Sequence, residues 1–473
     1  MKYGFIAIFF LACFKLSAQK SSSPNIIFIL ADDLGYGDIG CYGQQKIETP
    51  NIDKLAKEGI KFTQFYSGST VCAPARSSFL TGLHTGHTQV RGNKPYGPEG
   101  QMPLPDSVVT FVNILQKNGY ATAAFGKWGL GFITTSGDPN KKGFDRFYGY
   151  NCQSLAHDYF PPYLWNNYEK VDLSVNKTND SIYSASLIHS KAIEYIQQTG
   201  DKPFFLYLPY TLPHGDVIGP HDELYSYYVK KFGEQPRTGK ELTTRPHNMT
   251  PESQLHAQFA AMVGRLDIYV GEIVKAVKEK GIAENTLIIF TSDNGPHREN
   301  GGDPDFFNSN GDFKGIKRDL YEGGIRVPFI AYWPGKIKSG INNRPAALWD
   351  MYPTFLQLAG IANENKVDGI SLVPSLLKKT KQKEHEYFYW EFHENDGRQA
   401  VLWGKWKGVR LAVNSIADAP IELYDLQNDP GENNNVAEKF PSIVRQINVV
   451  MKREHVFNPD WPFLKSEMVN EKN

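Results

Sequence analysis

Oxygen-bearing side chains follow two apolar segments of this sequence. Asp32 and Asp33 end the run NIIFILADD (25–33), and Asp293 and Asn294 follow the run TLIIFTS. Carboxylate and amide oxygens are the ligands that hard divalent cations prefer, and they suit zinc less well. Such residues also cap helices and form Asx turns, which explains most single DD or DNG motifs. Two of these motifs in one chain favour a Ca²⁺ site, with Mg²⁺ as the alternative.

Three groups that donate hydrogen bonds occupy comparable positions. Lys127 follows the apolar run ATAAF, His214 follows PFFLYLPYTLP, and Lys314 lies in GDFKGIKRDLYEGG. Most lysines are solvated surface charges, and His214 taken alone is equally well explained as a packed loop residue. Glycines beside both lysines indicate close approach of the backbone. Positive charge beside a metal would bind a tetrahedral oxyanion, either sulfate or phosphate.

A cysteine opens the segment CAPARSSFLTG, with proline two residues and arginine four residues after it. Cysteines occur at positions 13, 41, 72 and 152, too few for a disulfide framework in a chain of 473 residues. Cys41 and Cys152 either pair or stay free. Ca²⁺ prefers oxygen to sulfur, so an oxygen nucleophile at position 72 would suit this metal better than a thiolate.

The segments that must position these residues alternate apolar strands with amphipathic helices. Strands are expected at 25–33, 121–125 and 286–291, and a helix begins near Pro50. This alternation predicts an α/β fold with a large, mostly parallel sheet sandwiched by helices. Ligands bind at the carboxyl ends of the strands in such sheets, so we expect the separate motifs to meet in one crevice.

Short aromatic runs replace this pattern near residue 375. HEYFYWEF, QAVLWGKWKGVRL and IELYDLQNDP predict a smaller antiparallel sheet, closed by a helix in FPSIVRQINVVMKREH. We therefore expect a catalytic α/β domain over residues 22–375 and a C-terminal subdomain over 376–473.

Polar residues in YWEFHENDGRQ of that subdomain are candidates for contact with a sugar substrate. They are Glu391, His393, Glu394 and Arg398. Most exposed charges have no such role, so solvation is the alternative explanation.

The overall charge and the N-terminus limit the class of protein. Lys and Arg total 51, as do Asp and Glu, so no basic excess indicates nucleic acid or anionic lipid. The segment MKYGFIAIFFLACFKLSAQK predicts a signal peptide over residues 1–18, cleaved after Ala18, because its apolar part is too short to span a bilayer. A lipoprotein site at Cys13 is the weaker alternative. We expect an exported protein, periplasmic or secreted, without a transmembrane segment.

The segment CAPAR (72–76), followed by LTG (80–82), resembles the signature of type I, formylglycine-dependent sulfatases, which are arylsulfatase-like members of the alkaline phosphatase superfamily. The segments ADD, GKW, PH, SDNG and FKG occur in the family's order, and the resemblance covers about residues 25–335. It implies an alkaline phosphatase-like fold and a formylglycine made from Cys72 by a formylglycine-generating, sulfatase-maturating enzyme. The Ca²⁺ ligands that it implies are Asp32, Asp33, residue 72, Asp293 and Asn294.

The resemblance also implies roles for the donors. A hydroxyl of hydrated residue 72 attacks sulfur, and the ester oxygen leaves with a proton from His214. Lys127 and Lys314 hold the sulfonate oxygens, and Arg76 supports residue 72 through hydrogen bonds. The second hydroxyl then loses its proton, which expels sulfate and restores the aldehyde. Asp293 is the candidate base for the attack.

Two positions depart from the family pattern. Gly129 stands where most members have a histidine two residues after the lysine of GKW, and that histidine is thought to assist sulfate release. His157 is a candidate replacement, and it is equally well explained as a residue that lines the substrate pocket or packs. Leu83 replaces the arginine that often ends the signature, which bears on recognition by the maturation enzyme.

The function implied by the resemblance is hydrolysis of sulfate esters. The expected substrate is a sulfated carbohydrate of the terminal galactose or hexosamine type. A phosphatase or phosphodiesterase of the same superfamily is the enzymatic alternative, but it would need several histidines around two transition metals, and few stand near the DD and DNG motifs. An inactive carbohydrate-binding homologue is the second alternative, which a failure to oxidise Cys72 would produce.

Overall fold

A computed structural model describes residues 23–237, 254–378, 380–416 and 418–463. The expected signal peptide and Cys13 lie outside these residues. No helix within the described part of the chain is both long and apolar enough to cross a membrane.

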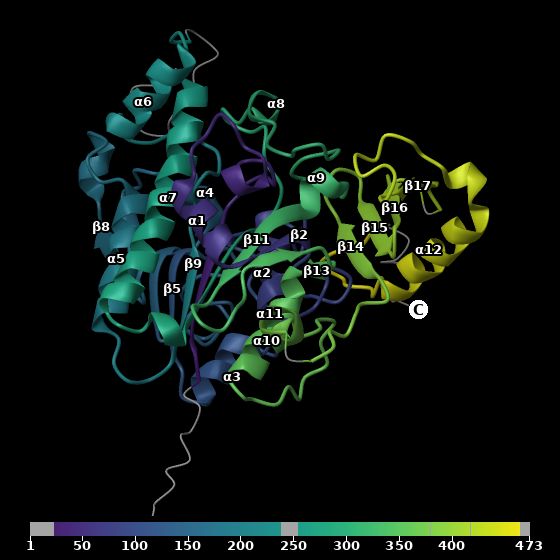
Figure 1. Cartoon of the computed structure of the whole chain (residues 1–473), viewed down its shortest axis with the longest axis horizontal. Coiled ribbons are helices and arrows are strands. Elements are labelled where there is room, and N and C mark those ends of the chain that lie inside the picture. The colour runs from purple at the N-terminus through teal and green to yellow at the C-terminus, as the bar shows by residue number, and fades with distance from the viewer. Residues whose placement is uncertain (1–22, 238–253, 379, 417, 464–473) are drawn as a thin grey trace, which may run out of the picture.

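An 11-stranded sheet forms the centre of the larger part of the molecule (Figure 1). Its order is β12-β2-β11-β10-β1-β9-β5-β6-β7-β8, and β13 pairs with β2. The central pairs β10-β1, β1-β9, β9-β5 and β5-β6 are parallel, whereas β11 and β7 pair with their neighbours in antiparallel fashion. The prediction of a large, mostly parallel sheet is confirmed.

The strands of this sheet and a separate short hairpin, β3-β4, have the following bounds. They are β1 (Asn25–Ala31), β2 (Ile60–Tyr66), β3 (Pro95–Tyr96), β4 (Gly100–Gln101), β5 (Ala121–Lys127), β6 (Arg146–Tyr150), β7 (Tyr163–Asn166), β8 (Glu169–Asp172), β9 (Phe204–Pro209), β10 (Thr286–Ser292), β11 (Arg326–Tyr332), β12 (Gly340–Asn342) and β13 (Ala346–Ala347).

Helices cover both faces of the sheet. The described α-helices are α1 (Pro50–Glu58), α2 (Cys72–Thr81), α3 (Phe111–Lys117), α4 (Gln153–Ala156), α5 (Ser184–Gln198), α6 (Glu223–Phe232), α7 (Leu255–Glu279), α8 (Pro304–Phe307), α9 (Glu322–Ile325), α10 (Met351–Leu358), α11 (Val373–Leu377) and α12 (Pro441–Glu454). Successive side chains of a strand point to opposite faces. Accordingly, Ile27 and Ile29 of β1 pack with α1, α5 and α7, while Ile26 and Phe28 pack with α2, α3 and α10. Burial on both faces explains why β1 reads as a continuous apolar run.

A four-stranded antiparallel sheet and α12 form the smaller part of the molecule, at the right of Figure 1. The strands follow one another as β14 (Phe388–Phe392), β15 (Arg398–Trp403), β16 (Trp406–Leu411) and β17 (Ile421–Asp425). Trp390 is fully buried, and its indole Nε1 donates to the carbonyl of Ser67 at 2.9 Å. The predicted small sheet with a closing helix is confirmed.

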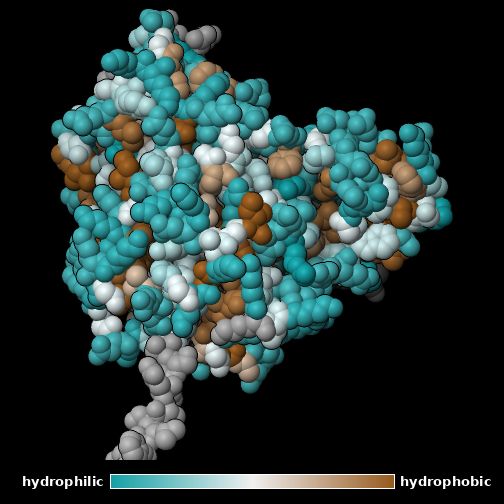
Figure 2. Space-filling view, viewed as in Figure 1, coloured by the Kyte–Doolittle hydropathy of each residue, from teal (hydrophilic) through white to brown (hydrophobic). Residues whose placement is uncertain are grey.

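The surface drawn in Figure 2 is mostly hydrophilic, with hydrophobic side chains scattered over both parts. Single exposed hydrophobic residues are ordinary on the surface of a folded protein.

Glu454 at the end of α12 joins the two parts of the molecule. Its Oε2 lies 3.3 Å from Nε2 of His84 and 3.6 Å from Nε2 of His87, while Oε1 accepts a hydrogen bond from Tyr387. The hydrogen bond with His84 lowers the pKa of Glu454 to about 2, although burial acts in the opposite direction.

We therefore expect Glu454→Gln to destabilise the fold in a pH-dependent way. A carboxyl with a depressed pKa in the folded state stabilises the protein above its unfolded pKa of about 4.3, and this contribution is lost as the pH falls toward 2. The free energy of unfolding at pH 7 should fall by about 1 kcal/mol, because water screens part of the interaction. Urea unfolding from pH 7 to pH 3 measures the difference. Glu438→Gln, at an exposed position, is the control. If the difference in unfolding free energy between wild type and Glu454→Gln stayed constant below pH 4, the depressed pKa of Glu454 would be contradicted.

Candidate active site

The carboxyl ends of three parallel strands bring the predicted oxygen and lysine groups together. Asp32 and Asp33 follow β1, Lys127 ends β5, and Asp293 and Asn294 follow β10. Nζ of Lys127 donates to Oδ2 of Asp32 at 2.7 Å, and Nδ2 of Asn294 donates to Oδ1 of Asp33 at 2.7 Å. The backbone N–H of Asp33 donates to Oδ1 of Asp293 at 3.2 Å. All five side chains are buried, so the separate motifs form one polar cluster.

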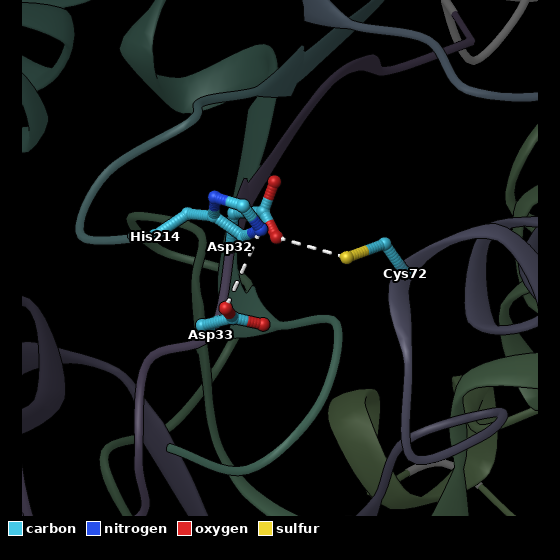
Figure 3. A group of neighbouring side chains, drawn as sticks. All are labelled: Asp32, Asp33, Cys72 and His214. Carbon is cyan, nitrogen blue, oxygen red and sulfur yellow. Dashed lines mark hydrogen bonds and ion pairs between the residues drawn. The ribbon is translucent and has the colours of Figure 1, made fainter. Parts of the chain in front are cut away.

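Cys72 is the first residue of α2 and faces this cluster. Its Sγ lies 3.3 Å from Oδ1 of Asp32 and 3.5 Å from Nζ of Lys127. Figure 3 shows the thiol directed toward Asp32, with Asp33 and His214 beside it. Burial and the charge of Asp32 raise the pKa of the Cys72 thiol well above its ordinary value. The thiolate is therefore disfavoured, so unmodified cysteine is a poor nucleophile here.

Arg76 explains the spacing of the CAPAR segment. Residues i and i+4 lie on the same face of a helix, so Arg76 reaches the cluster that Cys72 faces. Its Nη2 donates to Oδ2 of Asp293 at 2.8 Å and to Oδ2 of Asp32 at 3.1 Å, and Nη1 donates to the carbonyl of Lys127. Pro74 lies in the first turn of α2, where a backbone N–H has no intrahelical partner. Arg76 thus orients two carboxylates around residue 72.

The cluster has the ligand atoms that a divalent cation needs. Oδ1 of Asn294 is buried and accepts no hydrogen bond, so a lone pair in this cluster is left for another partner. Single ligand atoms of Asp32, Asp33, Cys72 and His214 also lie within 4.8 Å of one another. An orphaned acceptor beside carboxylates fits a hard cation.

The charges of the cluster support the same fit. Burial raises the pKa of Asp293 to about 7, with repulsion from Asp32 adding to it and Arg76 opposing it. Burial also acts to raise the pKa of Asp33, but the Lys317 and His297 side chains hold it at about 2. A divalent cation would favour the ionised form of every carboxylate in the cluster.

The structure places Lys317, rather than Lys314, in the cluster. Nζ of Lys317 donates to Oδ2 of Asp33 at 2.8 Å, and it lies 3.5 Å from Nε2 of His214. Lys314 points elsewhere, because its Nζ donates to Tyr424 Oη at 3.2 Å and lies 4.1 Å from the ring centroid of Tyr321. Lys317, three residues later in the same loop, therefore occupies the position in the cluster that was expected of Lys314.

Two histidines contact each other at this site. Nε2 of His214 lies 3.6 Å from Oδ2 of Asp33, and the ring centroids of His214 and His157 are 4.5 Å apart. Burial, followed by the charges of Lys127 and Lys317, lowers the pKa of His157 to about 4 and that of His214 well below its ordinary value. Both imidazoles are therefore neutral near pH 7 in the absence of a bound anion.

Gln153 occupies the space beside Gly129. A Cβ at Gly129 would lie 3.3 Å from Nε2 of Gln153, and the φ of +78° at this glycine is one that other residues rarely adopt. Nε2 of Gln153 donates to Oδ1 of Asn93 at 3.1 Å. No pattern in the sequence singled out Gln153 or Asn93, because both are neutral residues outside the motifs described above.

Glu391 and His393 have structural partners, which corrects their expected role as sugar ligands. The Glu391 carboxylate is fully buried and accepts hydrogen bonds from Arg91 at 2.7 Å and Tyr389 at 2.8 Å, with a ring nitrogen of His393 2.9 Å away. Arg398 has a partner within the protein, because its Nη1 donates to the carbonyl of Arg318 at 2.7 Å.

A cavity of about 980 Å³ lies away from this cluster. Tyr36, Phe62, Arg326 and Tyr387 are among its lining residues, and none of the predicted site residues lines it. The convergence of acids, cations and Cys72 identifies the active site better than cavity volume does.

Comparisons with known proteins agree with this geometry. A family model described as Sulfatase matches residues 24–361, and one described as N-sulphoglucosamine sulphohydrolase, C-terminal, matches residues 312–455. Human arylsulfatase A is 31% identical, and the alignment covers 90% of this chain and 86% of the relative. Human N-acetylgalactosamine-6-sulfatase is 30% identical, with 92% and 87% covered. The solved structure of Ps i-CgsB in complex with k-i-k-neocarrahexaose superposes with a TM-score of 0.77 at 28% identity, covering 95% of this chain and 97% of that chain.

The fold and the cluster together define an enzyme of the alkaline phosphatase superfamily that acts on an oxyanion ester. The chain belongs to the sulfatase family and hydrolyses sulfate esters.

Proposed function

We propose that this sulfatase acts on a sulfated carbohydrate, of the terminal galactose or hexosamine type, through a formylglycine at position 72 and a bound Ca²⁺. The buried Cys72, whose Sγ lies 3.3 Å from Oδ1 of Asp32 and 3.5 Å from Nζ of Lys127, is the observation that carries the proposal. The relatives support the substrate class, since one is an N-acetylgalactosamine-6-sulfatase and one was solved with k-i-k-neocarrahexaose.

Formation of the nucleophile precedes the reaction. A formylglycine-generating enzyme, which supplies a two-electron oxidant, converts the CH₂–SH group of Cys72 to an aldehyde: the C–S bond breaks, sulfur leaves as sulfide, and an oxygen atom replaces it. Water then adds to the aldehyde to give two hydroxyls. Asp32, Asp33, Asp293 and Asn294 would hold the cation, which would stabilise negative charge on oxygen. As part of this proposal the protein is exported, to the periplasm or the medium.

The residues of the chain then perform the transfer. One hydroxyl of residue 72 loses its proton to Asp293 and attacks sulfur, while the bond from sulfur to the ester oxygen breaks. Lys127 contacts Asp32 and Lys317 contacts Asp33, so both ammonium groups lie beside the aspartate pair and can donate to the sulfonate oxygens. Such preorganised donors stabilise the charge that develops in the transition state.

His214 and His157 transfer the protons that departure of the leaving group and release of sulfate require. A bound sulfate ester brings negative charge next to His214, which favours its protonated form and opposes Lys127 and Lys317. Protonated His214 donates to the departing ester oxygen. The second hydroxyl of residue 72 then loses its proton. His214 takes up this proton and passes it to His157, the proposed final acceptor. The bond from residue 72 to the sulfate oxygen breaks, which releases sulfate and restores the aldehyde.

The test combines mass spectrometry with product analysis. Protein co-expressed with a formylglycine-generating enzyme should show a loss of about 18 Da on the peptide that contains residue 72, and it should release inorganic sulfate from sulfated sugars. Full turnover by protein whose peptide still contains cysteine would overturn the mechanism. Release of phosphate from phosphate esters, without release of sulfate, would favour the phosphatase alternative.

Removal of divalent cations should reduce both activity and stability. The cluster holds three buried carboxylates, so a bound divalent cation stabilises the folded state by mass action. Dialysis against EDTA should abolish most turnover and lower Tm by several degrees. A shift of this size corresponds to the loss of about 2 kcal/mol of stabilisation by the bound cation. Activity assays and thermal unfolding after addition of Ca²⁺, Mg²⁺ or Zn²⁺ measure recovery. Restoration by Zn²⁺ alone would contradict the assignment of a hard cation.

A further inference from the structure

A chain of charged contacts leads from the buried cluster to the protein surface. Lys317, which donates to Asp33, also lies with its Nζ 3.3 Å from Oε2 of Glu299. Glu299 contacts Nη1 of Arg318, and Nε of Arg318 lies 3.8 Å from Oε2 of Glu394. Lys317 is buried, whereas the side chains of Glu299, Arg318 and Glu394 are 32%, 34% and 30% exposed. These last three residues, here called the acidic rim, therefore form a partly exposed group that contacts the buried cluster through Lys317.

The acidic rim also contacts the backbone next to the nucleophile. The N–H of Arg318 donates to the carbonyl of Thr70 at 3.1 Å, two residues before position 72. Glu394 accepts a hydrogen bond from the N–H of Asn93 at 2.9 Å, and the side chain of Asn93 accepts one from the N–H of Ala73 at 3.1 Å. Arg318 and Glu394 are thus tied to the residues on both sides of Cys72.

Arg318 is held in a conformation that costs free energy. Its φ is +76°, a region that non-glycine residues rarely adopt. Nη1 of Arg398 donates to the carbonyl of Arg318 at 2.7 Å and also contacts Asp319, which fixes this backbone from the smaller sheet. Backbone strain of this kind concentrates at binding sites, where it aims a side chain. Arg398 is thus a positioning residue for Arg318.

We infer that the acidic rim binds the sugar ring that carries the scissile sulfate. Carboxylates and a guanidinium that remain partly exposed can exchange part of their mutual contacts for hydroxyl groups, which both donate and accept. Two carboxylates and one guanidinium give the rim a net negative charge. A second sulfate or a carboxylate on that ring would meet this charge, so the substrate class is a monosulfated, otherwise neutral sugar. This inference rests on the proposed sulfated-carbohydrate function.

The experiment compares two kinds of sulfate ester in the same variants. For wild type, Arg318→Ala, Glu394→Ala and Glu394→Gln, kcat/KM is measured on a panel of monosulfated galactose and N-acetylhexosamine isomers and on 4-nitrophenyl sulfate, which has no hydroxyls. The ratio of sugar to aryl kcat/KM should fall by about 10- to 100-fold in the alanine variants, because hydrogen bonds to charged groups are strong. Arg344→Ala is the control, because it removes a more exposed arginine (50% against 34% for Arg318) from an ion pair with Glu384.

A second comparison tests the charge of the rim. Wild type should have a higher kcat/KM on monosulfated glucosamine than on N,6-disulfated glucosamine. This difference in kcat/KM should be smaller in Glu394→Gln. The inference would be overturned if the ratio of sugar to aryl kcat/KM were unchanged in both alanine variants, or if wild type preferred the disulfated sugar. Either result would leave the sulfatase function intact. A wild-type protein, with formylglycine verified, that hydrolyses aryl sulfate but none of the sugars would instead overturn the proposed carbohydrate substrate, and the inference with it. Circular dichroism of each variant verifies that it is folded.

Discussion

Replacing Cys72 with alanine is expected to lower the rate of sulfate release by at least about a thousandfold, the order of effect seen when a covalent nucleophile is removed. Alanine has no group that oxidation can convert to an aldehyde, so no hydroxyl can attack sulfur. The donors around position 72 would still bind the sulfate group, because Lys127 and Lys317 are held by Asp32 and Asp33. We therefore expect kcat to collapse while binding of a sulfated sugar, measured by calorimetry, persists.

The Cys72→Ala variant should fold normally, which makes the result interpretable. Sγ forms only weak contacts with Asp32 and Lys127, so its loss removes no strong interaction. Cys41→Ala is the matched control, since Cys41 is also a free thiol and is not part of the cluster. Cys72→Ser distinguishes the route of maturation, because only a maturation enzyme that accepts serine would restore turnover. Wild-type activity in Cys72→Ala would contradict the covalent mechanism.

The strands that carry the site could be predicted from the sequence because burial on both faces leaves a clear pattern. The runs at 25–31 and 286–292 are mainly apolar and buried throughout, and the polar residues directly after them must lie at one edge of a parallel sheet. The positions of Asp32, Asp33 and Asn294 follow from this rule alone. Side chains that follow strand ends are therefore the part of the site that sequence reasoning places best.

Residues on loops could not be placed in the same way. Lys314 and Lys317 lie in one glycine-containing loop, and which of them turns inward depends on φ at Gly315 and Arg318, both of which are positive. The sequence shows two lysines and no periodicity that distinguishes them. Only the hydrogen bond from Lys317 to Asp33 settles the choice.

The sequence also contained no sign that a charged side chain, Glu391, would be buried in the smaller sheet. Glu391 occurs among aromatic and charged residues, a composition typical of an exposed strand end. It is buried because Arg91, 300 residues away along the chain, supplies the opposite charge that a buried carboxylate requires. Pairing over this sequence separation leaves no local signal. The partly exposed Glu394, three residues later, keeps the surface position that the same segment suggested for Glu391.

Lys317→Met should lower activity far more than Lys314→Met, although the two lysines are three residues apart. Lys317→Met removes a donor aimed at the sulfate position, and kcat/KM should fall by about 100- to 1000-fold, as for the loss of an oxyanion donor. Lys314 contacts Tyr424 and Tyr321 outside the cluster, so Lys314→Met should change kcat/KM little and cost up to about 1 kcal/mol of stability through the lost cation–π contact.

The stability of Lys317→Met should also depend on the cation. Without Lys317 the carboxylate of Asp33 loses its direct ion-pair partner in a fully buried position, and breaking a buried ion pair costs about 3–5 kcal/mol. A bound Ca²⁺ would compensate that charge, so the variant should lose far more stability in EDTA than in Ca²⁺. Thermal unfolding of wild type and both variants under the two conditions measures this difference. An equal loss of stability in EDTA and in Ca²⁺ would mean that Lys317 and the cation do not share Asp33, because the two positive charges can substitute for each other only if they act on the same carboxylate.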